Sequence, residues 1–156
     1  MSMNLLTENI YVLDDKTKES IREKFCISFI DTKKDGYREA IEEKEEYSDG
    51  YCYNGYLWDY IANVTVVEEN YMKTKITKMN EVYALWDIHS SEKILIENYW
   101  KFKKDDIVKL KGDTLIEKLH LFPEDLYVFD NTYGWVMVFT HEYFDNKRYC
   151  LEAGNI

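Results

Sequence analysis

Two apolar runs near the C-terminus constrain the fold of this chain more than any other feature. Leu126–Phe129 and Trp135–Phe139 are aliphatic and aromatic, and residues 130–134 between them include Asp, Asn and Gly. Turn residues between two such runs are typical of a β-hairpin. Pro123, the only proline, ends any helix that arrives from upstream. Because nearly every residue of both runs is apolar, the pattern predicts a central strand pair that is covered on both faces.

A second hairpin is predicted upstream of this one. Val82–Ile88 and Lys93–Glu97 are mostly apolar, and the residues between them, 89–92, form a polar turn. Two hairpins predict a mostly antiparallel sheet. Shorter apolar runs predict edge strands over residues 10–13 and 148–152, the latter after a turn at Asp145-Asn146.

The N-terminal half has mostly helical periodicity. Ile21, Phe25 and Phe29 recur every four residues after an N-cap at Asp14-Asp15, which predicts a helix over residues 16–30. Similar patterns predict a helix over 36–46 with Asp35 as its cap, a helix over 66–78, and short helices over 105–110 and 114–120.

The segment around Asn54-Gly55 fits two interpretations. These residues either form the turn of a tight hairpin or end a loop, and Tyr56–Ile61 then begins a strand or a helix. The periodicity does not decide between them, although a strand is favoured slightly.

The order of elements indicates an α+β fold. Helices followed by antiparallel hairpins predict N-terminal helices packed on one face of a mostly antiparallel sheet, which is built from the two C-terminal hairpins. A length of 156 residues predicts a single domain over 1–156.

The composition argues against several classes of function. The net charge of -10, with Arg at only three positions, argues against nucleic acid and anionic membranes as partners. The N-terminus lacks the pattern of a secretion signal, and no apolar run is long enough to span a bilayer, so a cytoplasmic location is expected. Cys26, Cys52 and Cys150 lack the spacing of a disulfide framework or a zinc site, and no cofactor motif is present.

Several short segments resemble a known group of proteins. They are GYLW (Gly55–Trp58), WDIHS (Trp86–Ser90) and LYVFD (Leu126–Asp130), followed by Trp135 and THE (Thr140–Glu142). These segments resemble small uncharacterised bacterial proteins of low-GC genomes that share a domain of unknown function. The resemblance covers about residues 55–150 and implies an α+β fold. It brings no catalytic residues.

Three polar side chains are candidates for chemistry. Asp87 and His89 share a face of one predicted strand, and strand alternation places His141 on the face of Trp135. If the two hairpins pair, the three residues form a cluster that holds a metal ion or acts as a general base. The simpler interpretation is a histidine at a strand end that is paired with a carboxylate or a backbone carbonyl. Cys26 and Cys150 are interpreted as small core residues, whereas Cys52, which lies between two tyrosines in a loop bounded by glycines, is expected to be the least buried of the three.

The second candidate is an acidic segment rich in tyrosine. Residues 35–69 hold ten acidic residues and two basic ones, so this segment carries -8 of the net charge. A surface of this kind steers a basic partner at long range, and tyrosines anchor it. The simpler interpretation is a solvated helix face. The proposed steering residues are Glu42, Glu43, Glu45, Glu46 and Asp49, and the proposed anchors are Tyr47, Tyr51 and Tyr53.

Three functions follow from these candidates. The first is a non-enzymatic acidic protein that binds a basic protein, as immunity proteins and antitoxins do. This link rests on an analogy with that class of small acidic proteins. The second is a small hydrolytic or metal-assisted enzyme that uses Asp87, His89 and His141. The third is an interaction domain or a homodimer that pairs through an edge strand.

Overall fold

The computed structural model describes residues 9–88 and 102–154. Seven strands form one antiparallel sheet in the order β1-β6-β5-β7-β8-β9-β4, and β2 and β3 form a separate hairpin. The strands are β1 (Tyr11–Val12), β2 (Lys44–Tyr47), β3 (Gly50–Tyr53), β4 (Thr65–Val67), β5 (Val82–Asp87), β6 (Val108–Leu110), β7 (Asp125–Phe129), β8 (Trp135–Phe144) and β9 (Lys147–Gly154).

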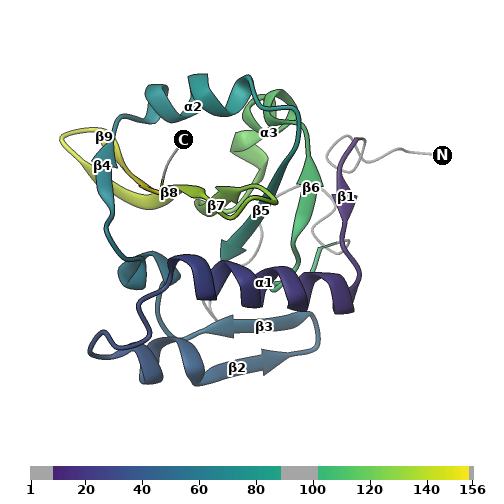
Figure 1. Cartoon of the computed structure of the whole chain (residues 1–156), viewed down its shortest axis with the longest axis vertical. Helices are drawn as coiled ribbons and strands as arrows, with labels where there is room; N and C mark the ends of the chain where they lie inside the picture. Colours follow the sequence, from purple (N-terminus) through teal and green to yellow (C-terminus); the bar gives the residue numbers. More distant parts are fainter. Residues whose placement is uncertain (1–8, 89–101, 155–156) are drawn as a thin grey trace.

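The helices lie on both faces of this sheet. Figure 1 shows α2 and α3 on one side and α1 on the other, with the β2–β3 hairpin outside α1. The helices are α1 (Asp15–Phe29), α2 (Glu69–Thr77), α3 (Gly112–Glu117), the π-helix η1 (Arg38–Glu42) and the 3-10 helices η2 (Leu57–Tyr60) and η4 (Leu119–Leu121). The α+β class and the antiparallel sheet are therefore confirmed, and the sheet is covered on both faces.

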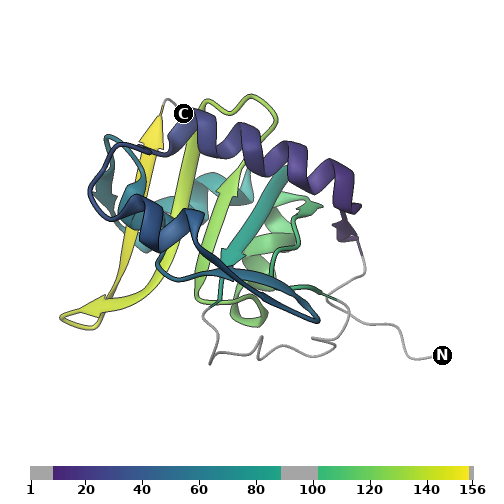
Figure 2. The ribbon, with the colours of Figure 1, turned by 90° about the horizontal axis from the view of Figure 1, so that it is seen from below.

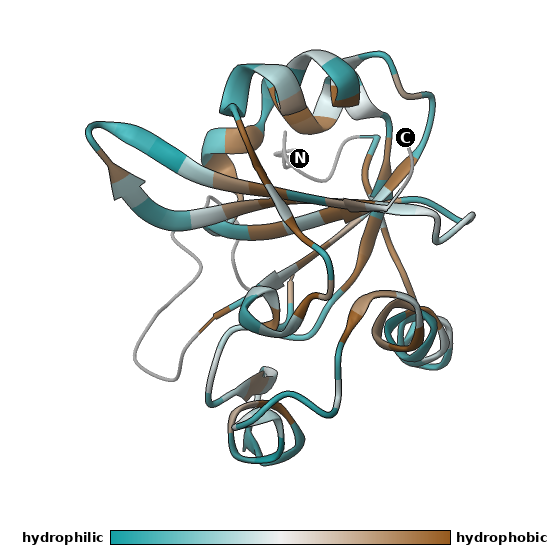
Figure 3. Cartoon of the chain, turned by 60° about the vertical axis from the view of Figure 1, so that its left-hand side comes forward, coloured by the Kyte–Doolittle hydropathy of each residue, from teal (hydrophilic) through white to brown (hydrophobic). Residues whose placement is uncertain are grey.

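Two hydrophobic cores flank the sheet. In the first, Met72 and Ile76 of α2 and Leu115 of α3 pack on one sheet face. In the second, Phe25 and Phe29 of α1 pack on the opposite face. Figure 3 shows the hydrophobic colour concentrated along the strands between the two layers of helices. All residues of β7 are buried, as the uniformly apolar pattern predicts for a central strand.

Most of the predicted strands and the first helix are present. The hairpin of β7 and β8 has the predicted five-residue connection, and Asp14 caps α1 by accepting a hydrogen bond from the Thr17 N–H at 2.8 Å. The strand at residues 11–12 is an edge strand, as expected. The strand after Asp145-Asn146 forms as β9, but β4 lies outside it, so β9 is not the edge. The predicted strand at 93–97 lies outside the described residues.

Four predicted elements differ from the structure. Residues 36–46 do not form one helix: the short η1 ends at Glu42 and β2 begins at Lys44. The predicted helix over 105–110 is replaced by β6. The first residues of the predicted helix over 66–78 belong to β4. Neither a hairpin turn at 54–55 nor a strand at 56–61 forms, because β3 ends at Tyr53 and η2 follows.

The end of β8 and the start of β9 extend beyond the neighbouring strands of the sheet. Figure 2 shows the β8–β9 hairpin reaching past the neighbouring strands, while β2–β3 crosses in front of the sheet, on the same side of it as α1. Pairing between β8 and β9 shifts between Phe139 and Tyr143, where three residues of β8 oppose one residue of β9. This bulge changes the direction of the side chains that follow it.

Candidate functional site

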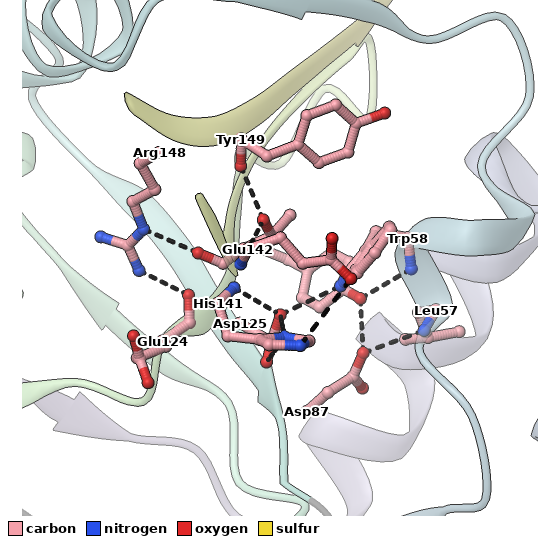
Figure 4. A network of polar contacts seen from close by, with 11 residues as sticks. Leu57, Trp58, Asp87, Glu124, Asp125, His141, Glu142, Arg148 and Tyr149 are labelled. Carbon is pink, nitrogen blue, oxygen red and sulfur yellow. Dashed lines mark hydrogen bonds and ion pairs between the residues drawn. The ribbon is translucent and has the colours of Figure 1, made fainter. Parts of the chain in front are cut away.

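A network of polar side chains lies where β5, β7 and β8 meet the 3-10 helix η2. Asp87 of β5 and Asp125 of β7 are register partners, so their side chains lie on the same face of the sheet. Both carboxylates are buried, at 4% and 2% exposure. Figure 4 shows Leu57 and Trp58 of η2 approaching these two carboxylates, and His141 of β8 beside Asp125.

The Asp87 carboxylate accepts hydrogen bonds from two donors. Its Oδ2 accepts a hydrogen bond from the Leu57 backbone N–H at 2.9 Å and another from the Tyr127 hydroxyl. Burial nevertheless raises the pKa of Asp87 to about 7, and the nearby Asp125 acts in the same direction. Burial and the neighbouring Asp87 also raise the pKa of the Tyr127 hydroxyl well above its ordinary value.

Asp125 is the carboxylate that holds His141. The His141 Nδ1 lies 3.0 Å from both Asp125 oxygens, and the His141 backbone N–H donates to Oδ1 at 3.1 Å. Trp58 Nε1 also donates to Oδ1, at 3.0 Å. A buried carboxylate in this arrangement orients the imidazole ring.

The bulge in β8 explains why His141 reaches Asp125. Uninterrupted alternation predicts His141 on the face of Trp135, which is the face covered by α2 and α3. The structure places it on the opposite face, beside Tyr56 and Trp58. That prediction is therefore wrong, because the bulge between Phe139 and Tyr143 interrupts the alternation of two residues on which it rested.

An aromatic group covers this end of the network. The Tyr56 and Trp58 rings stack with centroids 5.5 Å apart, and the Tyr56 ring lies 4.9 Å from the His141 ring. The Tyr127 hydroxyl also accepts a hydrogen bond from the Trp58 backbone N–H at 2.7 Å. Hydrogen bonds from the backbone N–H groups of Leu57 and Trp58 and from the Trp58 indole thus hold segment 57–60 in place. These bonds explain why it forms a tight helical turn instead of a strand.

The predicted Asp87, His89 and His141 cluster is only partly described. Asp87 and His141 belong to the same network, but His141 contacts Asp125, while Asp87 contacts Tyr127 and Leu57. His89 lies outside the described residues. Within residues 9–88 and 102–154, no group of three or more His, Cys, Asp or Glu side chains could hold a metal ion.

The acidic candidates lie on η1 and on the separate β2–β3 hairpin. Glu42, Glu43, Glu45 and Glu46 are all exposed, and Glu39 beside them is exposed as well. Asp49 is less exposed, and its Oδ2 lies 3.6 Å from Lys104 Nζ. The carboxylates are thus close in sequence but divided between two elements, with Glu39 and Glu42 on η1 and Glu45 and Glu46 on β2.

The three tyrosines of this segment have different environments. Tyr47 is 38% exposed, and its ring lies beside Lys104 Nζ at 5.5 Å. Tyr53 is buried, and its hydroxyl accepts a hydrogen bond from Arg22 Nη1 at 3.2 Å. Tyr51 is half-buried between the Arg22 and Lys44 side chains. Of the three proposed anchors, Tyr47 is therefore exposed beside the acidic residues as predicted, whereas Tyr51 and Tyr53 pack inward.

Arg22 explains why these tyrosines turn inward. It is 6% exposed on α1, and its Nη2 donates to the Asp105 carbonyl at 2.9 Å. A buried guanidinium needs partners for its donors and gains from flanking aromatic rings. The sequence pattern of α1 gives no sign of this role, because Arg22 follows Ile21 at the edge of the apolar stripe and looks like a surface residue.

Comparisons with known proteins add no assignment. No family model matches the chain, and neither the curated proteins nor the solved structures contain a significant match to it. The resemblance of residues 55–150 to small bacterial proteins therefore stays a prediction. Among the described helices, none combines the length and apolar character needed to cross a membrane.

Proposed function

We propose that this chain is a non-enzymatic acidic binding protein of the immunity or antitoxin type, which binds a basic protein partner. The proposed docking surface, called here the acidic edge, consists of Glu39, Glu42, Glu43, Glu45 and Glu46. One observation carries this proposal: all five carboxylates are exposed, and none forms an ion pair with another described residue.

Electrostatics give the acidic edge two properties that suit such a partner. Unpaired carboxylates on one edge attract a basic surface during diffusion and raise the association rate. One of them, Glu45, accepts a hydrogen bond from the Tyr47 hydroxyl, which joins the proposed aromatic contact to the acidic edge. Tyr47, at the end of β2, is positioned to add an aromatic contact at the rim.

The hairpin is well supported for this role. It is a separate two-stranded sheet outside the main sheet, and Arg22, Tyr51 and Tyr53 fix its inner face to α1. Charged side chains along β2 also prevent unwanted pairing of this strand with other sheets. The acidic edge is thus rigidly held while it remains open to a partner.

A pull-down with matched charge variants tests the proposal. In the first variant, Glu42, Glu43, Glu45 and Glu46 are replaced by Gln; in the control, Glu68, Glu81, Glu117 and Glu124, which are exposed elsewhere, are replaced by Gln. Both variants lose four negative charges. We expect a basic protein to be retained by the native chain and the control at low salt, released at high salt, and not retained by the first variant.

Equal retention by both variants would contradict the proposal, because the total charge and not the acidic edge would then decide binding. Retention that does not change between low and high salt would contradict it as well.

A second candidate function, pairing through an edge strand, is favoured by a different surface. β4 is an edge strand of the sheet, and beside it lies a groove of about 720 Å³ between the start of α2 and the end of the β8–β9 hairpin. Val66, Tyr143 and Phe144 line this groove at 62%, 54% and 57% exposure. Light scattering of the native chain and of Val66→Lys tests it: a dimer that the substitution dissociates would support edge pairing.

A further inference from the structure

The residue pair Asn54-Gly55, which follows β3, is bonded to the C-terminal end of η1. The Gly55 backbone N–H donates to the Ala40 carbonyl at 2.8 Å. The Asn54 side-chain Nδ2 donates to the carbonyls of Glu39 and Glu43, at 3.2 and 2.8 Å. Carbonyls at the end of a helix have no acceptor role left within it, so these donors act as the cap of η1.

Gly55 is needed for the close approach of the two segments. A Cβ at this position would lie 2.7 Å from the Ala40 Cβ, so any other residue would push η1 away. Asn54 is needed as well, because its amide supplies two N–H donors from one side chain. The fold therefore keeps an Asn-Gly pair at this place, and the sequence contains no other.

An Asn-Gly pair is chemically labile. The backbone nitrogen of the glycine loses its proton and attacks the asparagine Cγ, and ammonia leaves as the bond between Cγ and Nδ2 breaks. Water then opens the succinimide ring that has formed, which leaves aspartate or isoaspartate. Glycine has no Cβ to hinder the attack, so Asn54 is the asparagine of this chain that is most open to deamidation.

The fold holds both reacting groups in hydrogen bonds. The attacking nitrogen belongs to Gly55, whose proton lies on the Ala40 carbonyl, and the leaving Nδ2 of Asn54 is bonded to two carbonyls. These bonds must break before the ring can close, so the reaction requires local opening of this contact. The Asn54 side chain is exposed, so water is at hand once the contact opens.

We propose that Asn54 is a modification site, at which deamidation irreversibly detaches the end of η1 from the residues that follow β3. The product has a carboxylate in place of the amide, and this carboxylate faces the carbonyl oxygens of Glu39 and Glu43. A carboxylate cannot donate to these oxygens, and it lies at the negative end of the helix dipole. The original contact therefore does not form again.

The modification acts on the part of the chain that carries the acidic edge. Glu39 and Glu43 belong to that edge, and β2 begins directly after them, at Lys44. Deamidation adds one negative charge beside the edge and removes the contact that holds it to Asn54. The reaction does not need a partner, so its test is independent of the pull-down described above.

Timed incubation of the full-length chain at mildly alkaline pH tests the site. Peptide mass spectrometry follows the deamidation of each asparagine in the folded chain and in the chain unfolded by urea. We expect Asn54 to react faster than every other asparagine in urea, and at least about tenfold more slowly in the folded chain. Equal rates for Asn54 in the two conditions, or a faster reaction of another asparagine in urea, would overturn the proposal.

Two matched variants separate local opening from global unfolding. Ile41 of η1 and Ile76 of α2 are both buried, and they belong to the cores on opposite faces of the sheet. Under conditions in which circular dichroism shows both variants folded, Ile41→Ala should deamidate at least about threefold faster than the native chain. Ile76→Ala should react at the native rate. Equal acceleration in both variants would contradict the local contact.

The effect of the product is measured on two variants of the same residue. Asn54→Ala removes the donors, whereas Asn54→Asp also introduces the charge that deamidation creates. We expect Asn54→Asp to melt about 2–4 °C below Asn54→Ala, and both to melt below the native chain. A melting temperature of Asn54→Asp equal to that of the native chain would overturn the proposed loss of contact.

Discussion

Asp87 and Asp125 face each other across β5 and β7, yet each carboxylate is held by different donors. Asp87 takes the Tyr127 hydroxyl and the Leu57 N–H, and Asp125 takes Trp58 and His141. Two buried acids in this arrangement favour a proton on one of them. The raised pKa of Asp87, about 7, identifies that residue as the one that keeps its proton in the folded chain up to about neutral pH.

Asp87 should therefore make folding sensitive to pH in a defined direction. Its pKa is about 7 in the folded chain and 3.8 in the unfolded reference, so the folded chain binds more protons between these values. Below about pH 4, Asp87 is protonated in both the folded and the unfolded chain, and its contribution to the free energy of unfolding is largest. As the pH rises toward 7, the unfolded chain loses this proton while the folded chain keeps it, so the free energy of unfolding falls by roughly 4 kcal/mol. Asp87→Asn does not titrate.

Urea unfolding of both proteins from about pH 4 to 8 measures this difference. We expect the free energy of unfolding of the native chain to fall relative to that of Asp87→Asn as the pH rises. The exposed substitution Asp113→Asn serves as the control and should leave the pH dependence unchanged. Parallel curves for the native chain and Asp87→Asn would contradict the burial of an ionisable Asp87.

The Tyr127 hydroxyl joins η2 to the sheet, and its removal should destabilise the fold. Tyr127→Phe keeps the ring in the core but leaves the Trp58 N–H without its acceptor and Asp87 without one donor. Buried groups that lose a partner typically cost about 1–3 kcal/mol each, so we expect a loss of about 2–4 kcal/mol. Tyr11→Phe, at a residue 65% exposed, is the matched control and should change the stability by less than ~0.5 kcal/mol. Similar denaturation midpoints for the two variants would contradict the role of this hydroxyl.

Gly112 lets α3 begin directly against α2. A Cβ at this position would lie 1.8 Å from the Ile76 carbonyl oxygen, which the backbone cannot accommodate without moving one helix. Gly112→Ala should therefore lower the free energy of unfolding by about 3 kcal/mol or more, whereas the exposed neighbour Asp113→Ala should cost less than ~1 kcal/mol. Equal melting temperatures for the two variants would refute this close approach.

The cysteines should react with thiol reagents in the order of their burial. Burial raises the pKa of Cys150 to about 12 and also raises the pKa of Cys26 and Cys52. Because the thiolate is the reactive form, we expect slow alkylation of the native chain, with Cys26, the least buried thiol, modified first. Mass spectrometry of peptides after timed alkylation measures this order. Rapid modification of Cys150 in the folded chain would be inconsistent with its buried position.

The parts of the fold that depend on local patterns could be predicted from the sequence. The apolar stripe of α1, its cap at Asp14 and the hairpin of β7 and β8 all follow from periodicity and turn residues. The acidic segment was also visible, because charge is read directly from composition. These features need no information about which distant segments meet.

The candidate network could not be predicted, because it depends on contacts between distant residues. Asp125 looked like the residue before a strand, and its role as the partner of His141 requires the bulge in β8. Similarly, η2 forms because Tyr127 and Asp87 hold its backbone, and residues 44–47 form a strand because β3 pairs with them. Tertiary contacts outweighed local propensity at each of these places.

The salt dependence of partner binding tests the central claim most directly. Once a basic partner is retained, its dissociation constant is measured by titration at several salt concentrations, with the native chain, the acidic-edge variant and the four-charge control. We expect the native chain and the control to lose affinity steeply and in parallel as salt rises, while the acidic-edge variant binds weakly with a shallow dependence. A steep dependence that the acidic-edge variant retains in full would contradict the assignment of this surface.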